Sequence, residues 1–445
     1  MRWALRGVRI VAPMGALMVG LSACEQQTAT EPSGATAPLS TAGTEQPSNT
    51  VVFLNATVWD GTDAEPMNGA SLVVADGRVV AVGGETAPDG AAVVDLGGAF
   101  VMPGLINTHG HVNDRWAGEE ITDAAERVRD GLRLYARYGV TTVVSLGGAP
   151  DAAFSIGDSI DPAALDHARF YIAGPVVTNE NPAAAREQAR DNLRRGVDWL
   201  KLRVDDNLGR GQKMPWELVE AVLDVGRAAG VPVATHIFYL ADAERLLDMG
   251  SGMIAHSVRD VPVTDAFMDA LERSGVCYVP TLTREVSTFV YGERPDFFDD
   301  PFFARGANAA EVARVSQPEF MEAMATSDVA AGYRSALVQA NANLATLSAA
   351  NARIGFGTDS GPGGRFPGYF EHLELSMMVD AGMSSKSALI SATSRAAECV
   401  GLPDVGSLKP GKWADFLVLA ENPLDDIRQT KSLRNVYIAG SEISP

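Results

Sequence analysis

The chain is long and acidic, and its composition is that of a globular protein. It has 445 residues, of which 46% are hydrophobic and 21% charged, with a formal net charge of −20. Its length and hydrophobic fraction are sufficient for a sizeable core. Nucleic acid is excluded as an expected partner, because proteins that bind phosphate backbones normally carry a basic surface. A small-molecule substrate is expected instead, and a homo-oligomer is left open as an alternative to a monomer.

The first residues have the pattern of an export signal. Arg2, Arg6 and Arg9 precede an apolar run, IVAPMGALMVGL, which is too short to span a bilayer and typical of a signal-peptide core. The run ends in LSAC, which resembles the bacterial lipobox. Residues 1–23 are therefore predicted to be a signal peptide and Cys24 to be lipidated. This predicts an exported periplasmic or cell-surface lipoprotein that contacts the membrane through its lipid anchor only.

A low-complexity segment follows the leader. Residues 24–50 are rich in Thr, Ala, Pro, Ser and Gln and contain almost no large apolar side chain, so they are predicted to form a disordered tether. The two other cysteines, Cys277 and Cys399, lie in apolar patterns. Their sequence context suggests free buried thiols and no disulfide, although an exported location permits one.

Both ends of the remaining chain are rich in strand and turn signals. Residues 51–103 contain short β-rich runs divided by Gly and Asp-Gly, and residues 403–445 contain two more. Two β-rich ends that flank a long middle predict one small β-sandwich domain built from both of them.

The middle of the chain alternates strand-like runs with helix-like stretches such as residues 121–138 and 214–230. The eight runs are GLINTH (104–109), GVTTVVSLGG (139–148), ARFYIAGPVV (168–177), VDWLKLRV (197–204), VPVATHIF (231–238), GMIAHS (252–257), GVCYVPTL (275–282) and ARIGFGTD (352–359). This alternation predicts an α/β fold, a (β/α)8 TIM barrel over residues 104–402. Residues 284–351 form an unusually long connection, which predicts a lid or specificity element, with a packing insertion as the alternative.

Polar residues gather where the predicted barrel strands end. Four of the six histidines, one lysine and one aspartate have this position: His109, His111, Lys201, His236, His256 and Asp359. Working groups of such barrels lie at the carboxyl ends of the strands, and residues two apart in a strand point to the same side. A lone histidine there is more often structural, but six such residues at one face predict a metal site.

These motifs resemble the amidohydrolase superfamily from residue 51 to the C-terminus. PGLINTHGH, GVTTV, GTDSG, AGMSSKSALISATSRAAECVGL and GSLKPGKWADFLVL are similar to its imidazolonepropionase-like and Xaa-Pro dipeptidase-like branch. The resemblance implies two divalent ions, with zinc expected and Mn, Co or Fe left open. It implies that His109, His111 and Asp359 bind the more buried ion, that His236 and His256 bind the second, and that an N6-carboxylated Lys201 bridges both.

This ligand set predicts an enzyme that hydrolyses an amide bond. A hydroxide held by two metal ions would attack the carbonyl carbon, and Asp359 would act as general base and then as general acid toward the leaving amine. The expected substrate is a dipeptide or N-acyl amino acid with a free carboxylate. The alternatives are a mononuclear deaminase or imidazolonepropionase-like cyclic amide hydrolase, in which Lys201 stays a free amine, and a non-catalytic binding lipoprotein.

Several weaker candidates surround these six residues. Arg203 lies two residues beyond Lys201 and is predicted either to anchor a substrate carboxylate or to pair with a nearby aspartate. Tyr239 and Thr281 follow strands and either line the pocket or fill space, and His372 either orients substrate or packs. His167 is expected on the surface.

Overall fold

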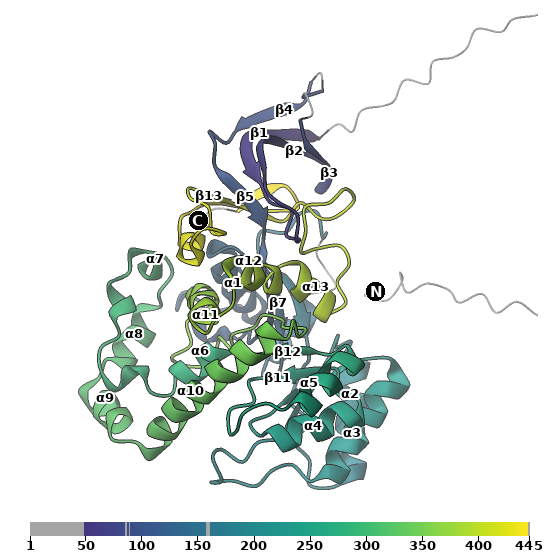
Figure 1. The fold of residues 1–445 in the computed structure, drawn as a ribbon, viewed down its shortest axis with the longest axis vertical. Coiled ribbons are helices and arrows are strands. Elements are labelled where there is room, and N and C mark those ends of the chain that lie inside the picture. The colour runs from purple at the N-terminus through teal and green to yellow at the C-terminus, as the bar shows by residue number, and fades with distance from the viewer. Residues whose placement is uncertain (1–48, 85–86, 89, 157–160, 444–445) are drawn as a thin grey trace, which may run out of the picture. The chain divides into compact units, whose positions relative to one another are not determined.

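Three sheets organise the part of the chain that the computed structural model describes (Figure 1). The described residues are 49–443 without 85–86, 89 and 157–160. The predicted signal peptide, Cys24 and the predicted tether up to residue 48 lie outside them.

The first sheet is built from both ends of the described chain. Strand order is β15-β14-β13-β5-β1-β2-β3, with β4 paired to β1. Its strands are β1 (Thr50–Val58), β2 (Met67–Ala75), β3 (Arg78–Gly83), β4 (Ala92–Asp95), β5 (Phe100–Pro103), β13 (Phe416–Leu419), β14 (Leu433–Ile438) and β15 (Ser441–Ile443). The pairing of β5 with β13 joins the two ends of the described chain in one sheet. The description of this region as a sandwich of two packed layers stays a prediction.

Aromatic side chains hold the two chain ends of this sheet together. Phe53 of β1 contacts Phe416 of β13, with ring centroids 4.9 Å apart, and Phe416 stacks on Tyr437 of β14 at 4.5 Å. A buried ion pair between Arg169 and Asp415, at 2.6 Å, links β13 to the next sheet. This ion pair thus connects the end sheet to β8 at Arg169.

The two other sheets consist of parallel strands. They are β6-β7-β8, with β6 (Leu105–Gly110), β7 (Val140–Ser145) and β8 (Arg169–Ile172), and β9-β10-β11-β12, with β9 (Leu200–Arg203), β10 (Val233–His236), β11 (Met253–Ala255) and β12 (Cys277–Val279). Trp199 N, just before β9, donates to Ile172 O of β8 at 3.3 Å and so connects the two sheets, and Thr108 N of β6 donates to Phe356 O, in the segment after Ile354, at 2.9 Å. All seven strands coincide with runs predicted from the sequence.

The eighth predicted strand is reduced to a single bridge between Ile354 and Tyr278 of β12. Glycine weakens a strand and marks close backbone approach, and Gly355 and Gly357 flank Phe356. A Cβ atom at Gly357 would lie 2.7 Å from Cβ of His109. This segment therefore lacks regular strand pairing and instead lies in close contact with the end of β6.

Helices follow most of the parallel strands. They are α1 (Ala124–Arg137), α2 (Pro182–Arg194), α3 (Trp216–Ala229), α4 (Leu240–Met249) and α5 (Asp265–Ser274), with short turns η1 (Asp114–Trp116) and η2 (Asp151–Ser155). Asp123 begins α1, because its side chain accepts a hydrogen bond from Glu126 N at 2.8 Å. The α/β alternation predicted from the sequence is present.

The long connection after β12 folds into seven short and long helices of its own. These are α6 (Leu282–Val286), η3 (Val290–Gly292), η4 (Asp296–Asp299), α7 (Pro301–Ala304), α8 (Ala309–Val315), α9 (Pro318–Ala325) and α10 (Asp328–Ala349). Its aromatic rings contact those that follow the final bridge: Phe303 lies 4.9 Å from Phe366 and 5.1 Å from Tyr369. The insertion is thus packed against α11 (Tyr369–Asp380), which α12 (Ser385–Ser391), α13 (Ser394–Cys399) and η5 (Ile427–Lys431) follow.

A disulfide joins Cys277 to Cys399, so the expectation of free thiols is wrong. The cysteines are 122 positions apart in the sequence, yet their Cα atoms lie 5.7 Å apart because α13 ends beside β12. Proximity of this kind comes from tertiary packing and leaves no local sequence pattern.

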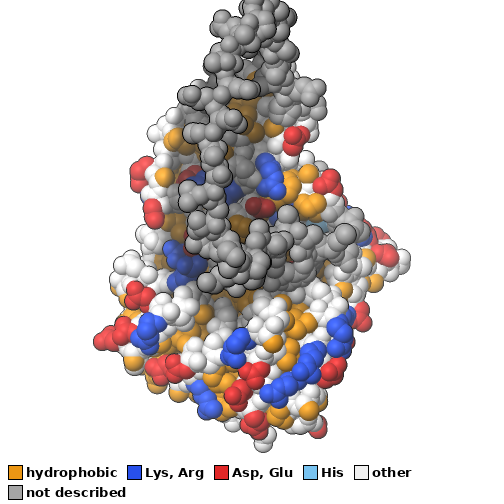
Figure 2. Space-filling model, turned by 90° about the vertical axis from the view of Figure 1, so that its right-hand side faces the viewer, with side chains coloured by type: hydrophobic (Ala, Val, Ile, Leu, Met, Phe, Trp, Pro, Cys, Tyr) orange, Lys and Arg blue, Asp and Glu red, His pale blue; other side chains and the backbone are white. Residues whose placement is uncertain are grey.

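The surface of α2 and α3 mixes charges of both signs. Arg186 pairs with Asp224, and Arg194 with Glu187 and Asp191. Figure 2 shows basic and acidic side chains side by side on the part of this face that undescribed residues leave visible. Among the described helices, none has the length and apolar character needed to cross a membrane.

Candidate metal and catalytic site

The six predicted ligands come from five different strand ends. His109 lies in β6 and His111 one residue beyond it, Lys201 lies in β9, and His236 ends β10. His256 directly follows β11, and Asp359 follows the bridge at Ile354. The carboxyl ends of neighbouring parallel strands meet at one edge, so distant parts of the sequence converge there.

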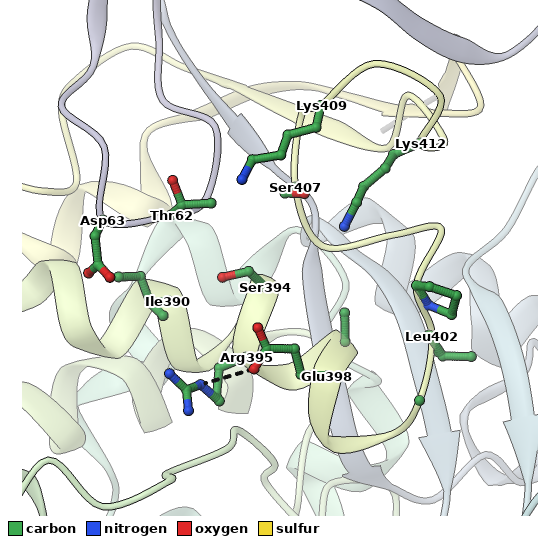
Figure 3. A pocket seen from close by; sticks show the side chains of 13 residues that line it. Thr62, Asp63, Ile390, Ser394, Arg395, Glu398, Leu402, Ser407, Lys409 and Lys412 are labelled. Carbon is green, nitrogen blue, oxygen red and sulfur yellow. Dashed lines mark ion pairs between the residues drawn. The ribbon is translucent and has the colours of Figure 1, made fainter.

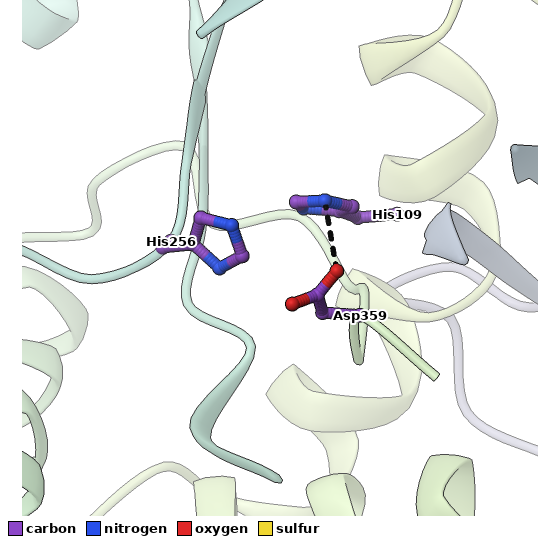
Figure 4. Close-up of side chains that lie close together, drawn as sticks. All are labelled: His109, His256 and Asp359. Carbon is purple, nitrogen blue, oxygen red and sulfur yellow. Dashed lines mark ion pairs between the residues drawn. The ribbon is translucent and has the colours of Figure 1, made fainter. Parts of the chain in front are cut away.

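The convergence is close enough for a metal ion. One ligand atom each from His109, His256 and Asp359 lies within 4.8 Å of the others (Figure 4). The ring of His256 lies 4.5 Å from that of His109 and 4.0 Å from that of His236. Nζ of Lys201 lies 3.2 Å from Nε2 of His109. All of these side chains are buried.

Strained backbone marks the same place. His256, Thr281 and Asp359 have φ angles of 79°, 52° and 56°, in the left-handed region that non-glycine residues rarely adopt. Such strain persists where the surrounding structure over-determines it, and it concentrates at functional sites. Here it turns side chains at the ends of β11, β12 and the final bridge toward one point.

The buried imidazoles are suited to bind metal because they are held neutral. Burial lowers the pKa of His109 and His256 well below its usual value, and it lowers the pKa of His236 to about 3. Neighbouring cations add to this effect, Lys201 for His109 and Arg284 for His236. Nδ1 of His109 and Nε2 of His256 have no hydrogen-bond partner among the described residues. Buried polar atoms without partners are costly, and a cation would satisfy the free Nε2 of His256; in His109 it is Nε2 that faces Lys201 and Asp359.

Hydrogen bonds from outside the cluster orient the remaining nitrogen atoms. Nδ1 of His111 donates to Gly147 O at 2.7 Å, which directs Nε2 toward Oδ1 of Asp359 at 2.6 Å. Nδ1 of His256 bonds to Oγ1 of Thr281 at 2.6 Å. Thr281 thus contacts a histidine of the cluster, and orienting bonds of this type are the usual support of metal-binding histidines.

Lys201 is enclosed beside this cluster. Its side chain is buried, and the loss of hydration lowers the pKa of its amine to about 7, against the opposing effect of the Asp359 carboxylate. A substantial fraction of a neutral amine near pH 7 follows, which is the form that reacts with carbon dioxide.

Three of the four weaker candidates bond to residues other than the six of the cluster. The Arg203 side chain is 42% exposed and donates to Asp205 at 3.3 Å, so it pairs with a nearby aspartate. The hydroxyl of Tyr239 donates to Asp206 at 2.8 Å. Both ring nitrogens of His372 are bonded elsewhere, to Thr430 at 2.9 Å and to Tyr138 O at 2.7 Å. This favours the packing alternative for His372.

His167 is buried and not on the surface as expected. Nδ1 of its ring lies 2.8 Å from Ala168 O.

Sequence reasoning did not assign some residues that contact the site. Oδ2 of Asp205 bonds to Nε2 of His236 at 2.9 Å, and Arg365 pairs with Oδ2 of Asp359. Glu371, buried on α11, accepts hydrogen bonds from Asn107 at 2.6 Å and from Ser360 at 2.7 Å, the residues beside His109 and Asp359. The acidic pair after β9 and the arginine after GTDSG were the available signals, but neither predicts its partner.

A different surface pocket lies away from this cluster. It separates the end sheet from α12 and α13, and Asp63, Ser394, Arg395, Lys409 and Lys412 are among the residues that line it (Figure 3). No histidine lines it, so the chemistry of the chain is assigned to the strand-end cluster.

Comparison with known proteins identifies the family. The model of the amidohydrolase family matches residues 100–443. The chain belongs to the amidohydrolase family. It is an enzyme that hydrolyses carbon–nitrogen bonds, which rejects the alternative of a non-catalytic binding protein.

Individual amidohydrolases resemble the chain over most of its length. It is 25% identical over 404 residues to imidazolonepropionase of Deinococcus deserti, covering 85% of this chain and 92% of that one. It is 24% identical over 464 residues to ochratoxinase of Aspergillus niger, covering 91% and 88%. The solved structure of a provisionally named prolidase from Bifidobacterium longum superimposes with a TM-score of 0.73, at 25% identity over 89% and 95% of the two chains.

Proposed function

We propose that this amidohydrolase cleaves the amide bond of a small substrate that carries a free carboxylate, a dipeptide or an N-acyl amino acid. The observation that carries the proposal is the convergence of His109, His256 and Asp359 at strand ends within 4.8 Å. In this proposal the seven parallel strands and the bridge at Ile354 form a (β/α)8 barrel with the cluster at its carboxyl end, and the end sheet forms a β-sandwich.

The donor set fits two divalent ions. His109, His111 and Asp359 would hold one, His236 and His256 the other, and Lys201 would bridge them. Imidazole and carboxylate donors of this kind suit zinc. When bound, the ions would lower the pKa of a water molecule and polarise the substrate carbonyl.

The protein's own groups then position and move protons. Asp359 is ionised, because the Arg365 guanidinium and His111 hold the pKa of its carboxyl well below the usual value against the effect of burial. It accepts a proton from the attacking water and donates that proton to the leaving nitrogen. The hydrogen bonds of Thr281 to His256 and of Gly147 to His111 keep the imidazoles in place during this exchange.

Lys201 is proposed to be carboxylated at Nζ. Burial favours the neutral amine, and the carbamate formed from it is an anion that two cations would stabilise. The distance of 3.2 Å between Nζ and Nε2 of His109 supports this proposal, because a carbamate at Nζ would lie close to the proposed ligands.

A mononuclear enzyme with a free Lys201 is the second candidate. The resemblance to imidazolonepropionase over 85% of the chain favours it, as does the attraction between the Lys201 ammonium and the Asp359 carboxylate. The number of metal ions per chain separates the two, since one ion indicates the second candidate.

The location proposed is outside the cytoplasm, with Cys24 as a lipid anchor. The Cys277–Cys399 disulfide supports this, because disulfides persist in oxidising compartments and are rare in the cytosol. In cells, Cys24→Ala is expected to leave the protein unprocessed or release it from membranes. Full-length precursor that is soluble in the cytoplasm would contradict the assignment.

The substrate class is tested by identifying products. Metal-loaded protein is incubated with dipeptides, N-acyl amino acids, lactams, carbamates and amino-substituted rings, and products are separated by mass. Cleavage of amides with a free carboxylate is expected. Ammonia from rings without amide cleavage across the panel would refute it.

A further inference from the structure

Two arginines approach the cluster from the side of the insertion. Arg365 lies between Asp359 and α11, pairs with Oδ2 of Asp359, and donates through Nε to Oγ of Ser287 at 2.9 Å. Arg284 lies on α6, and the Ser287 hydroxyl donates to its carbonyl at 2.6 Å. Ser287, in the turn that follows β12, therefore contacts both arginines.

The insertion fixes the position of each guanidinium. Arg284 lies over the ring of Tyr333, 4.3 Å from its centroid, and donates to its hydroxyl at 3.3 Å. Hydrogen bonds hold both backbone groups of Gly364, the residue before Arg365. Gly364 N donates to Glu311 at 2.5 Å, and the Tyr291 hydroxyl donates to Gly364 O. Tyr333, Glu311 and Tyr291 all belong to the insertion, which thus builds one wall of the site.

Three arginines here, Arg259, Arg284 and Arg365, share two paired carboxylates, those of Glu285 and Asp359. Glu285 is shared, pairing with Arg259 at 3.1 Å and with Arg284 at 3.0 Å. Nε of Arg284 has no hydrogen-bond partner within the described part of the chain. The carboxylate that pairs with Arg365 is Asp359, which the proposed function assigns to metal binding and proton transfer. Buried cations need anionic partners, so this wall is suited to accept an anion from outside.

We propose that Arg365, supported by Arg284, binds the carboxylate of the substrate. This inference rests on the proposed function and names its specificity determinant. A guanidinium presents paired N–H donors that match a carboxylate, which a lysine does not. Arg203, the residue that the sequence suggested for this role, is 42% exposed and donates to Asp205. Bound at Arg365, the carboxylate places an adjacent amide beside Asp359.

The test compares substrates that differ only in the carboxylate. Each N-acyl amino acid or dipeptide is paired with its C-terminal primary amide, and both are measured with wild type, Arg365→Met, Arg284→Met and the control Arg294→Met. Arg294 belongs to the same insertion but forms an exposed pair with Asp299. Wild type and the control are expected to prefer the free acid. Arg365→Met should raise KM for the acid on the order of 100-fold and change KM for the amide by less than about 3-fold, while kcat falls for both because Asp359 loses the cation that lowers its pKa.

Binding and metal content keep the result interpretable. Calorimetric titration with N-acetyl-L-phenylalanine and its primary amide reports the subsite without catalysis, and elemental analysis shows whether the cluster is intact. Arg365→Lys is expected to recover part of the preference if Arg365→Met folds poorly. Equal weakening of acid and amide, or loss of the preference in Arg203→Met but not Arg365→Met, would overturn the proposal. Binding of the acid that depends on Arg365, without cleavage of any amide, would leave the subsite standing and refute the proposed function.

Discussion

Asp359 is the residue on which most contacts of the site converge. Its two oxygen atoms bond to His111 and Arg365, and its backbone N donates to His109 O at 2.7 Å. The left-handed φ of 56° is held in place by these bonds. Asp359 is thus held by two parts of the sequence, the end of β6 at His109 and His111 and the turn at Arg365.

Replacing Asp359 with Asn keeps the shape and removes the base. We expect kcat to fall about 10²- to 10⁴-fold, the range that general acid–base catalysis contributes, and the unfolding temperature to fall, because Arg365 loses its carboxylate partner. Steady-state kinetics and calorimetry measure the two effects. Retained kcat in a protein that still unfolds normally would assign the proton transfer to another group.

Lys201→Ala tests the bridge. The variant is expected to lose metal and activity, because a buried bridging anion is missing, and short carboxylic acids in the buffer should partly restore both. Lys386→Ala is the matched control, since Lys386 forms a surface pair with Glu65. A variant at position 201 that keeps two ions per chain would show that the lysine is not the bridge.

At the scale of elements, α11 connects the site to the end of the chain. Glu371 supports the strand ends, and on the same helix His372 bonds to Thr430 and Tyr138. Burial lowers the pKa of His372 from 6.5 to about 4. The folded protein therefore binds a proton at this histidine less readily than the unfolded chain does.

This shift makes His372 a source of acid sensitivity. Above about pH 6.5 this shift costs no stability, because the histidine is neutral in both states. As pH falls from 6.5 toward 4, the free energy of unfolding decreases through this histidine by at most about 3 kcal/mol. The free energy of unfolding in urea is measured between pH 7 and 4.5 for wild type and His372→Gln. The difference between them should shrink as pH falls. A difference that is independent of pH would contradict the assigned shift.

The sequence predicted strands better than side-chain partners. Seven parallel strands, and the gathering of polar side chains at their ends, follow from period, turn signals and the rule that sites lie at carboxyl ends. A full eighth strand was predicted where the structure has a single bridge. The close contact of Gly357 with His109 arises only in the folded chain, so the sequence pattern does not show it. Asp205 and Arg365 were missed for the same reason: a charged loop residue shows its partner only after the chain has folded.

Across the whole molecule, the disulfide ties β12 to the end of α13. Closing a loop of 122 residues restricts the unfolded chain, and its loss is expected to cost about 2–5 kcal/mol. Reduction should lower the unfolding temperature of wild type and leave the unfolding temperature of Cys399→Ser unchanged. Thiol titration of the denatured protein should gain two thiols on reduction. No gain would contradict the pairing.

The central claim is a two-metal amide hydrolase at the strand-end cluster. Its most direct test is the metal content of purified protein, measured together with amide cleavage, for wild type, His256→Ala and His167→Ala. His167 is a buried histidine remote from the cluster's contacts and serves as the control. Wild type and the control should hold about two ions per chain and cleave carboxylate-bearing amides, while His256→Ala loses metal and activity together. Full activity of metal-free wild type, or of His256→Ala, would contradict the claim.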